Sequence, residues 1–226
     1  MKSIRIAIFV SLLLTAFIST AQRKTYIGFN GGLNFGTADI FHRINGYNYE
    51  SQFVDGYQGG IVLMNFLPNH LGIQTGVSYV QKGWRQSFDN GEPDHSTELD
   101  FIEVPFMASI YSGKKSLHFF VSAGCFFEYR VNATVDPAPN DPGIYDFTLY
   151  DEDRDYKYGY GFKGGAGAFY DFRFGTIMLD INSSYSLSQA FKPPSIDSDI
   201  PHISSKINVG FTLGYLFSFG SFDKKD

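Results

Sequence analysis

The amino-acid sequence predicts an all-β fold, an eight-stranded antiparallel up-and-down transmembrane β-barrel. Apolar and polar residues alternate along most of the chain, which is the period-two pattern of strands with two different faces. The apolar phase is rich in rings, and the chain contains 24 Phe and 15 Tyr, as expected where aromatic side chains face lipid. The connections between the alternating segments are in turn long and short.

Residues 1–21 have the layout of a secretory signal peptide. Lys2 and Arg5 precede an apolar run over residues 7–18, and Ser19-Thr20-Ala21 places small residues before Gln22. The run is too short for a membrane-spanning helix. We therefore expect export to the outer membrane, with residues 22–226 forming one β-barrel domain. Without the first 21 residues the chain keeps 205 residues, and its net charge changes from −5 to −7.

This composition excludes several classes of function. A net acidic chain argues against nucleic acid as a partner. Cys125 is the single cysteine, so an intramolecular disulfide cannot form. The five histidines are scattered, with no pair at metal-ligand spacing, and we expect no metal site.

Eight segments alternate clearly enough to be assigned as strands. In the last of them Ile207, Val209 and Phe211 share one face, while Asn208 and Gly210 share the other. The second segment is ambiguous, because residues 61–64 are apolar on both faces. The eight segments are Tyr26–Gly36, Phe53–Leu67, Leu71–Lys82, Leu99–Ser112, Leu117–Arg130, Tyr156–Phe172, Thr176–Gln189 and Ser205–Phe219.

The connections favour a membrane barrel over a soluble sandwich. Membrane barrels with both termini in the periplasm have long outer hairpins and short inner turns. The third long connection is strongly acidic, with Arg154 among many carboxylates; it lacks the spacing of an EF-hand cation site, and we interpret it as a solvated loop. The long connections fall near residues 39–52, 85–97, 132–155 and 190–202, and the short ones near 67–70, 112–116 and 173–175.

The polar phase predicts a lumen filled by side chains, as eight strands leave little space. Several charged residues fall in this phase, and a buried charge is costly unless it is paired. We therefore expect a polar network that plugs the barrel, with a proton- or ion-conducting path as the alternative. Arg130 and Lys157, near the outer mouth, are candidates to complete the pairing. The expected network consists of Glu103, Glu128, Lys163, Asp171, Asp180 and Lys206.

Two patterns that suggest cofactor binding or catalysis have simpler interpretations. Residues 159–164 satisfy the dinucleotide string G-x-G-x-x-G, but that site needs a following helix, and the next residues keep alternating. We expect small lumen residues there and no cofactor. Ser122, His118 and Glu128 share one strand face but are spread over roughly 30 Å. No G-x-S-x-G elbow is present, so we expect no catalytic site and a non-enzymatic protein.

The segment Leu99–Tyr111 resembles the hydrophobic-Glu-hydrophobic-Pro strand of an outer-membrane β-barrel family common in Bacteroidota, which includes PorT-like proteins. Residues 19–22 resemble the cleavage region usual in that phylum, and residues 26–34 resemble the first strand of the family. The resemblance covers residues 22–220 and implies an integral outer-membrane barrel. Pro105 cannot donate a ladder hydrogen bond, so we expect a bulge there, with Glu103 directed inward.

Outer-membrane lipid and the barrel assembly machinery are the expected partners, together with extracellular or secretion-complex proteins at the long loops. Three alternatives to a plugged interaction barrel remain open. The PorT-like resemblance implies a component of a secretion system. A lipid-modifying enzyme and a narrow pore are the other two.

Overall fold

The computed structural model describes residues 24–41, 48–49, 51–86, 95–136, 155–192 and 203–219. The expected signal peptide and most of the acidic third connection, residues 137–154, lie outside the described residues. The described residues contain no helix that is long and apolar enough to cross a membrane.

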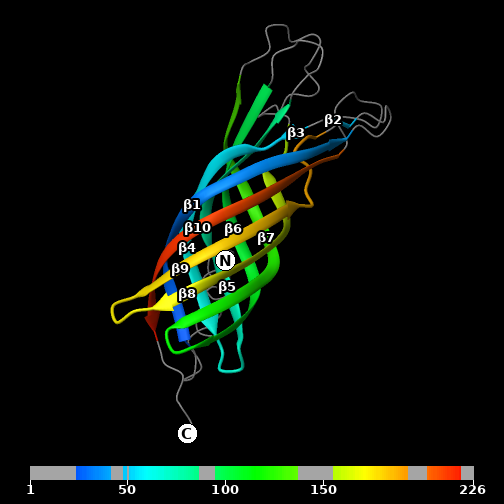
Figure 1. The fold of residues 1–226 in the computed structure, drawn as a ribbon. Helices are drawn as coiled ribbons and strands as arrows, with labels where there is room; N and C mark the ends of the chain where they lie inside the picture. Colours follow the sequence, from blue (N-terminus) through cyan, green and yellow to red (C-terminus); the bar gives the residue numbers. More distant parts are fainter. Residues whose placement is uncertain are drawn as a thin grey trace, which may run out of the picture.

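Eight long antiparallel strands form one closed barrel (Figure 1), which confirms the predicted fold class. Strands adjacent in sequence pair with one another, and β1 pairs with β10 to close the ring. Two short strands, β2 Asn48–Tyr49 and β3 Ser51–Gln52, pair with β1 and β5. The long strands are β1 Lys24–Phe41, β4 Val54–Phe66, β5 Leu71–Gln86, β6 His95–Lys114, β7 Leu117–Asp136, β8 Tyr158–Asp171, β9 Thr176–Ser186 and β10 Ile203–Phe219.

The strand bounds confirm the predicted alternation of connections. The turns β4–β5, β6–β7 and β8–β9 are short and lie at one end of the barrel, here called the short-turn end (Figure 1). The connections β1–β4, β5–β6, β7–β8 and β9–β10 leave the other end, here called the long-loop end.

The two faces of each strand follow the predicted phase. On β10 the side chain of Phe211 is exposed on the outside, while Asn208 and Gly210 are buried on the lumen side. The structure also resolves the ambiguous strand, since Ile61 is exposed and Val62 and Met64 are buried. Val62 and Met64 are apolar because they pack in a lumen core near the short turns.

Aromatic rings border an apolar band on the outer face. Tyr57, Tyr79, Tyr129, Tyr160 and Tyr185 are exposed toward the long-loop end, and Phe119, Tyr170, Phe172, Tyr215 and Phe217 toward the short-turn end. On β8 the two borders are Tyr160 and Tyr170. At about 3.4 Å per residue and a tilt of about 40°, this stretch spans about 26 Å. That height matches the apolar band of a transmembrane barrel, about 25 Å.

The pattern of inner and outer residues reverses beyond the upper border. Asp39 and Glu98 are exposed on the outside, whereas Ile40, Trp84 and Leu99 are buried in the lumen. A polar exterior around an apolar interior is the arrangement of a barrel in water. The strands therefore continue above the membrane band, and they are longer than predicted because polar outer residues there resemble a loop in sequence.

The expected bulge at Pro105 is wrong. The ladder between β6 and β7 changes register between Asp100 and Phe101, where Val131 is skipped, and it runs without interruption past Pro105. The ladder between β5 and β6 omits Pro105 but keeps its register. The Thr75 hydroxyl donates a 2.8 Å hydrogen bond to the Pro105 carbonyl oxygen. Because proline has no N–H, pairing with β5 is lost locally at Pro105, but no extra residue is inserted into β6.

We predict that Phe211→Arg destabilises the barrel by about 2–4 kcal/mol, because it places a cation in the apolar band. The matched variant Phe219→Arg, at the short-turn end of the same strand and face, should cost at most about 1 kcal/mol. Urea unfolding in lipid vesicles measures both values. Equal costs at the two positions would contradict the placement of the band.

Candidate functional site

The lumen is built in layers, and strand β6 passes through all of them. From the long-loop end downward, its buried residues include Phe101 in an apolar layer, Glu103 among charges, Met107 beside a polar cavity and Tyr111 in a second apolar layer. Because alternate residues point inward, side chains from several strands meet at each level. The candidate site is the charged level together with the cavity below it.

Five ionic side chains form what we call the central cluster: Lys82, Glu103, Glu128, Lys163 and Lys206. The Lys82 ammonium lies between the two carboxylates, 2.7 Å from an oxygen of Glu103 and 2.7 Å from one of Glu128. Lys163 Nζ is 2.6 Å from the other oxygen of Glu103, and Lys206 Nζ is 3.0 Å from the other oxygen of Glu128. The charges thus alternate along one chain of contacts drawn from β5, β6, β7, β8 and β10.

The central cluster is almost completely enclosed by protein. The side chains of Lys82, Glu103 and Glu128 are at most 1 % exposed. Lys82 Nζ also lies 4.5 Å from the centre of the Phe126 ring, and Lys206 Nζ lies 4.9 Å from that of Phe101. Ring faces stabilise desolvated cations, so these rings replace part of the water that the ammonium groups lose.

Gly159 makes room for the cluster. A Cβ atom at this position would collide with the carboxylate of Glu128. Gly161, two residues further along β8, lies against the ring of Phe126, which faces Lys82. These glycines belong to the string that resembles a dinucleotide site, and in the structure they lie inside strand β8.

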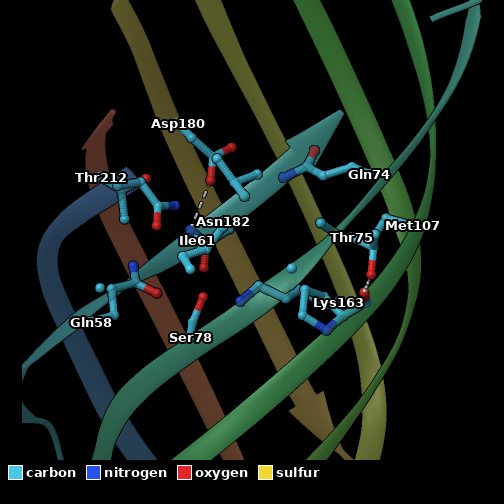
Figure 2. A pocket seen from close by; sticks show the side chains of 15 residues that line it. Gln58, Ile61, Gln74, Thr75, Ser78, Met107, Lys163, Asp180, Asn182 and Thr212 are labelled. Carbon is cyan, nitrogen blue, oxygen red and sulfur yellow. Dashed lines mark hydrogen bonds between the residues drawn. The ribbon is translucent and has the colours of Figure 1, made fainter. Parts of the chain in front are cut away.

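A polar cavity of about 30 Å³ lies next to the cluster (Figure 2). Figure 2 shows Gln58, Gln74, Lys163 and Asp180 around this space, with Asn182 donating a 2.9 Å hydrogen bond to Asp180. One oxygen of Gln74 and one of Asp180 are buried without a protein partner. A polar space of this size suits one or two ordered waters. Asp180 also supplies a carboxylate to the cavity that Lys163 lines.

An apolar layer closes the lumen at the short-turn end. This lower core contains stacked and tilted rings, with Phe169 5.0 Å from Tyr26 and 5.7 Å from Phe66 between ring centres. Below it, Asp171 contacts Lys24 at 2.5 Å and accepts a 2.6 Å hydrogen bond from Thr176. The lower core consists of Tyr26, Val62, Met64, Phe66, Tyr111, Phe120, Phe169, Met178 and Leu216.

A second apolar layer, the upper core, closes the lumen at the long-loop end. Its centre is Trp84, whose ring lies 5.8 Å from that of Phe191. Phe191 belongs to the connection after β9, and its backbone N–H donates to the Ser204 hydroxyl at 3.0 Å. A segment outside the strands is thus folded into the mouth. The upper core consists of Ala38, Ile40, Trp84, Leu99, Phe101, Ala190 and Phe191.

The structure brings together four of the six residues expected in the lumen network: Glu103, Glu128, Lys163 and Lys206. Asp171 lies with Lys24 at the short-turn end, and Asp180 lies at the cavity with Asn182. Two residues offered to complete the pairing are placed differently: Lys157 is exposed, and Arg130 is buried but is not one of the five.

Lys82 is the residue that sequence reasoning missed. It makes the only described contacts that link the two glutamates. A signal was present, because Lys82 continues the lumen phase of Gln74 and Val80 on β5. Lys82 is the last residue of the predicted strand Leu71–Lys82, where the alternation becomes less clear, so the sequence pattern alone does not place it in the lumen.

The three residues weighed for catalysis are not arranged as a catalytic triad. His118 Nε2 lies 3.7 Å from Asp171, and its ring stacks on Phe169. Glu128 contacts lysines, and the Ser122 hydroxyl is buried without a hydrogen-bond partner. Of the acidic third connection, the described Asp155 is buried and accepts a hydrogen bond from the Lys192 backbone. Among the described residues no group of three or more His, Cys, Asp or Glu suits a metal ion.

We predict that Lys82→Met lowers the free energy of unfolding by about 3–5 kcal/mol, because it leaves two buried carboxylates without their shared cation. Lys163→Met should cost less, since Glu103 keeps its contact with Lys82. Lys157→Met, at an exposed position, is the matched control and should stay within about 0.5 kcal/mol of the unmodified protein. Denaturant unfolding in lipid vesicles measures all three. Near-normal stability of Lys82→Met would mean that water solvates the cluster.

Comparisons with known proteins agree with this architecture. The family model described as "Outer membrane protein beta-barrel domain" matches residues 19–192. No curated protein matches the chain. Among solved structures, OprG of Pseudomonas aeruginosa is similar with a TM-score of 0.53 and 11% identity, over 89% of this chain and 98% of that one. Ail of Yersinia pestis is similar with a TM-score of 0.42 and 11% identity, over 85% of this chain and 98% of that one.

At 11% identity the likeness to OprG shows a shared fold alone, whereas the family match extends over most of the chain. The apolar outer band agrees with a membrane-spanning barrel of this kind. The chain belongs to the outer membrane protein beta-barrel domain family, and its barrel spans the outer membrane.

Proposed function

We propose that this protein is a non-conducting, non-enzymatic outer-membrane barrel. Its function is to bind a partner protein with the surface at the long-loop end. The observation that supports this most directly is the sealed lumen. The central cluster fills the middle, the lower core closes one side and the upper core closes the other. A conducting path would need continuous water, and the cavity beside the cluster holds only about 30 Å³.

The height of the barrel supports a role above the membrane. Strands β6 and β7 have 20 residues each, whereas about 9–11 residues cross the bilayer. On β6 residues 95–101 lie beyond Ile102, which pairs with the border residue Tyr79, and they extend the wall by about 18 Å at the usual rise and tilt. The upper core lies in this extension and stiffens it, so the rim of the described barrel stands at a distance from the lipid headgroups. Such a rigid, raised rim suits contact with a protein partner.

We predict that the purified protein gives no discrete current steps in planar lipid bilayers. Phe191→Ala, which removes one ring of the upper core, should remain silent as well, because the central cluster still fills the lumen. Single-channel recording at high salt measures both. Current steps in the unmodified protein would overturn the proposal of a sealed lumen. Current steps in Phe191→Ala alone would show that the upper core, and not the central cluster, seals the lumen.

The PorT-like resemblance of residues 99–111 favours one class of partner, a protein secretion complex. In the structure its motif glutamate, Glu103, belongs to the central cluster, so the motif stabilises the barrel, and the partner surface must lie elsewhere.

We predict that affinity-tagged protein extracted in mild detergent retains secretion subunits and that deletion of the gene reduces secretion of substrate proteins. Deletion should leave the phospholipid and lipid A profiles unchanged, because no catalytic arrangement is found among the described residues. A normal secretome would eliminate this class of partner, and an altered lipid profile would favour the lipid-modifying alternative.

A further inference from the structure

The outer wall has an apolar groove near the short-turn end that the sealed lumen does not explain. Ala108 on β6 and Ala123 on β7 face outward and pair directly across the two strands. Around them stand larger exposed side chains, Ile110 at 63 % and Val121 at 62 % exposure, and Ile73 on β5. The small residues therefore form the floor of a depression of about 470 Å³ with almost entirely apolar walls.

A basic turn lies beyond the groove, on the same outer side of the wall. Even-numbered residues of β6 face outward, so Lys114 lies on the same face as Ala108 and Ile110. Lys114 is four residues beyond Ile110, about 13 Å along the strand, and Lys115 follows it in the turn with a left-handed backbone, φ 59°. Both lysines are exposed. In an outer-membrane barrel the short turns face the periplasm, so both lie at the periplasmic lipid headgroups.

Charge at this end is one-sided in the part of the chain that the structure describes. Lys114, Lys115 and Arg173 are exposed in the short turns. The carboxylate described at this end, Asp171, is directed inward and contacts Lys24. Clusters of basic side chains at a membrane surface attract anionic lipid headgroups. A partner for this groove must therefore combine an apolar chain with a negative group at one end.

We propose that the groove holds one acyl chain of an anionic phospholipid of the periplasmic leaflet, with the phosphate against Lys114 and Lys115. In a bilayer every part of the wall contacts lipid, and apolar area alone does not select one molecule. Selection requires the shape of the groove and the headgroup contact together. This site does not depend on what the lumen or the long-loop end does.

The test is native mass spectrometry of the full chain in detergent, with phosphatidylglycerol or phosphatidylethanolamine of identical acyl chains. We expect one phosphatidylglycerol to be retained, about fivefold more strongly for each lysine that contacts its headgroup. Lys114→Gln combined with Lys115→Gln should remove this preference. Arg173→Gln is the matched control, because it removes a cation from the same end of the barrel but from another turn.

The groove itself is tested by Ala108→Phe, which fills the floor and should lower retention of both lipids. Val209→Phe, on the outer face of β10, is the control for added bulk. If Ala108→Phe does not fold, shortening the acyl chains of phosphatidylglycerol to eight carbons in the unmodified protein should weaken retention instead. Equal retention of the two lipids, or an equal effect of Arg173→Gln, would overturn the proposal. A dimer that Ala108→Phe abolishes would also overturn it, because a second copy would then occupy the groove.

Discussion

Lys82 lies between Glu103 and Glu128, with its ammonium 2.7 Å from an oxygen of each. The rest of the lumen depends on this arrangement, because a buried carboxylate that loses its cation is strongly destabilising. Rings of Phe101 and Phe126 lie beside the lysines, and Gly159 leaves the space that Glu128 occupies. The lower core and the upper core keep water away on both sides. The ion pairs join strands β5, β6, β7, β8 and β10 across the barrel, so they constrain its cross-section in addition to the ladder hydrogen bonds.

The same β-strands are surrounded by lipid in the membrane band and by water beyond it, and the polarity of their side chains changes at the boundary. Within the membrane band the outer face is apolar, and the lumen holds the polar cavity and the central cluster above the lower core. Beyond the tyrosines the outer face bears Asp39 and Glu98, and the lumen bears Ile40 and Trp84. The reversal follows from the solvent on the outside, since lipid accepts apolar side chains and water accepts charged ones. The upper third of the molecule is therefore built as a soluble barrel on a membrane barrel. This division explains why a rim above the membrane can be rigid.

The two ends of the barrel also differ in the function that we propose for them. A lumen filled by paired charges and two apolar layers leaves the outer surfaces as the places where the protein meets other molecules. In the proposed function the long-loop end is the extracellular partner surface, and the upper core supports it through Phe191. At the short-turn end the surface is an apolar groove beside Lys114. The two ends thus differ in chemistry, and each calls for a different kind of partner.

The sequence by itself determined the ring of eight strands, the facing of residues such as Phe211 and Gly210, and the order of long and short connections. It could do so because a period of two and the chemistry of lipid are local properties. Four of the six expected lumen charges lie in the central cluster, because each needed only the correct phase. Only the tertiary structure decided that Lys82 is the shared partner, that Asp171 and Asp180 lie apart, and that the register shifts at Asp100 and not at Pro105. Those facts depend on the stagger between neighbouring strands and on the closure of β1 against β10, which set the height of every side chain and are not recorded within any single strand.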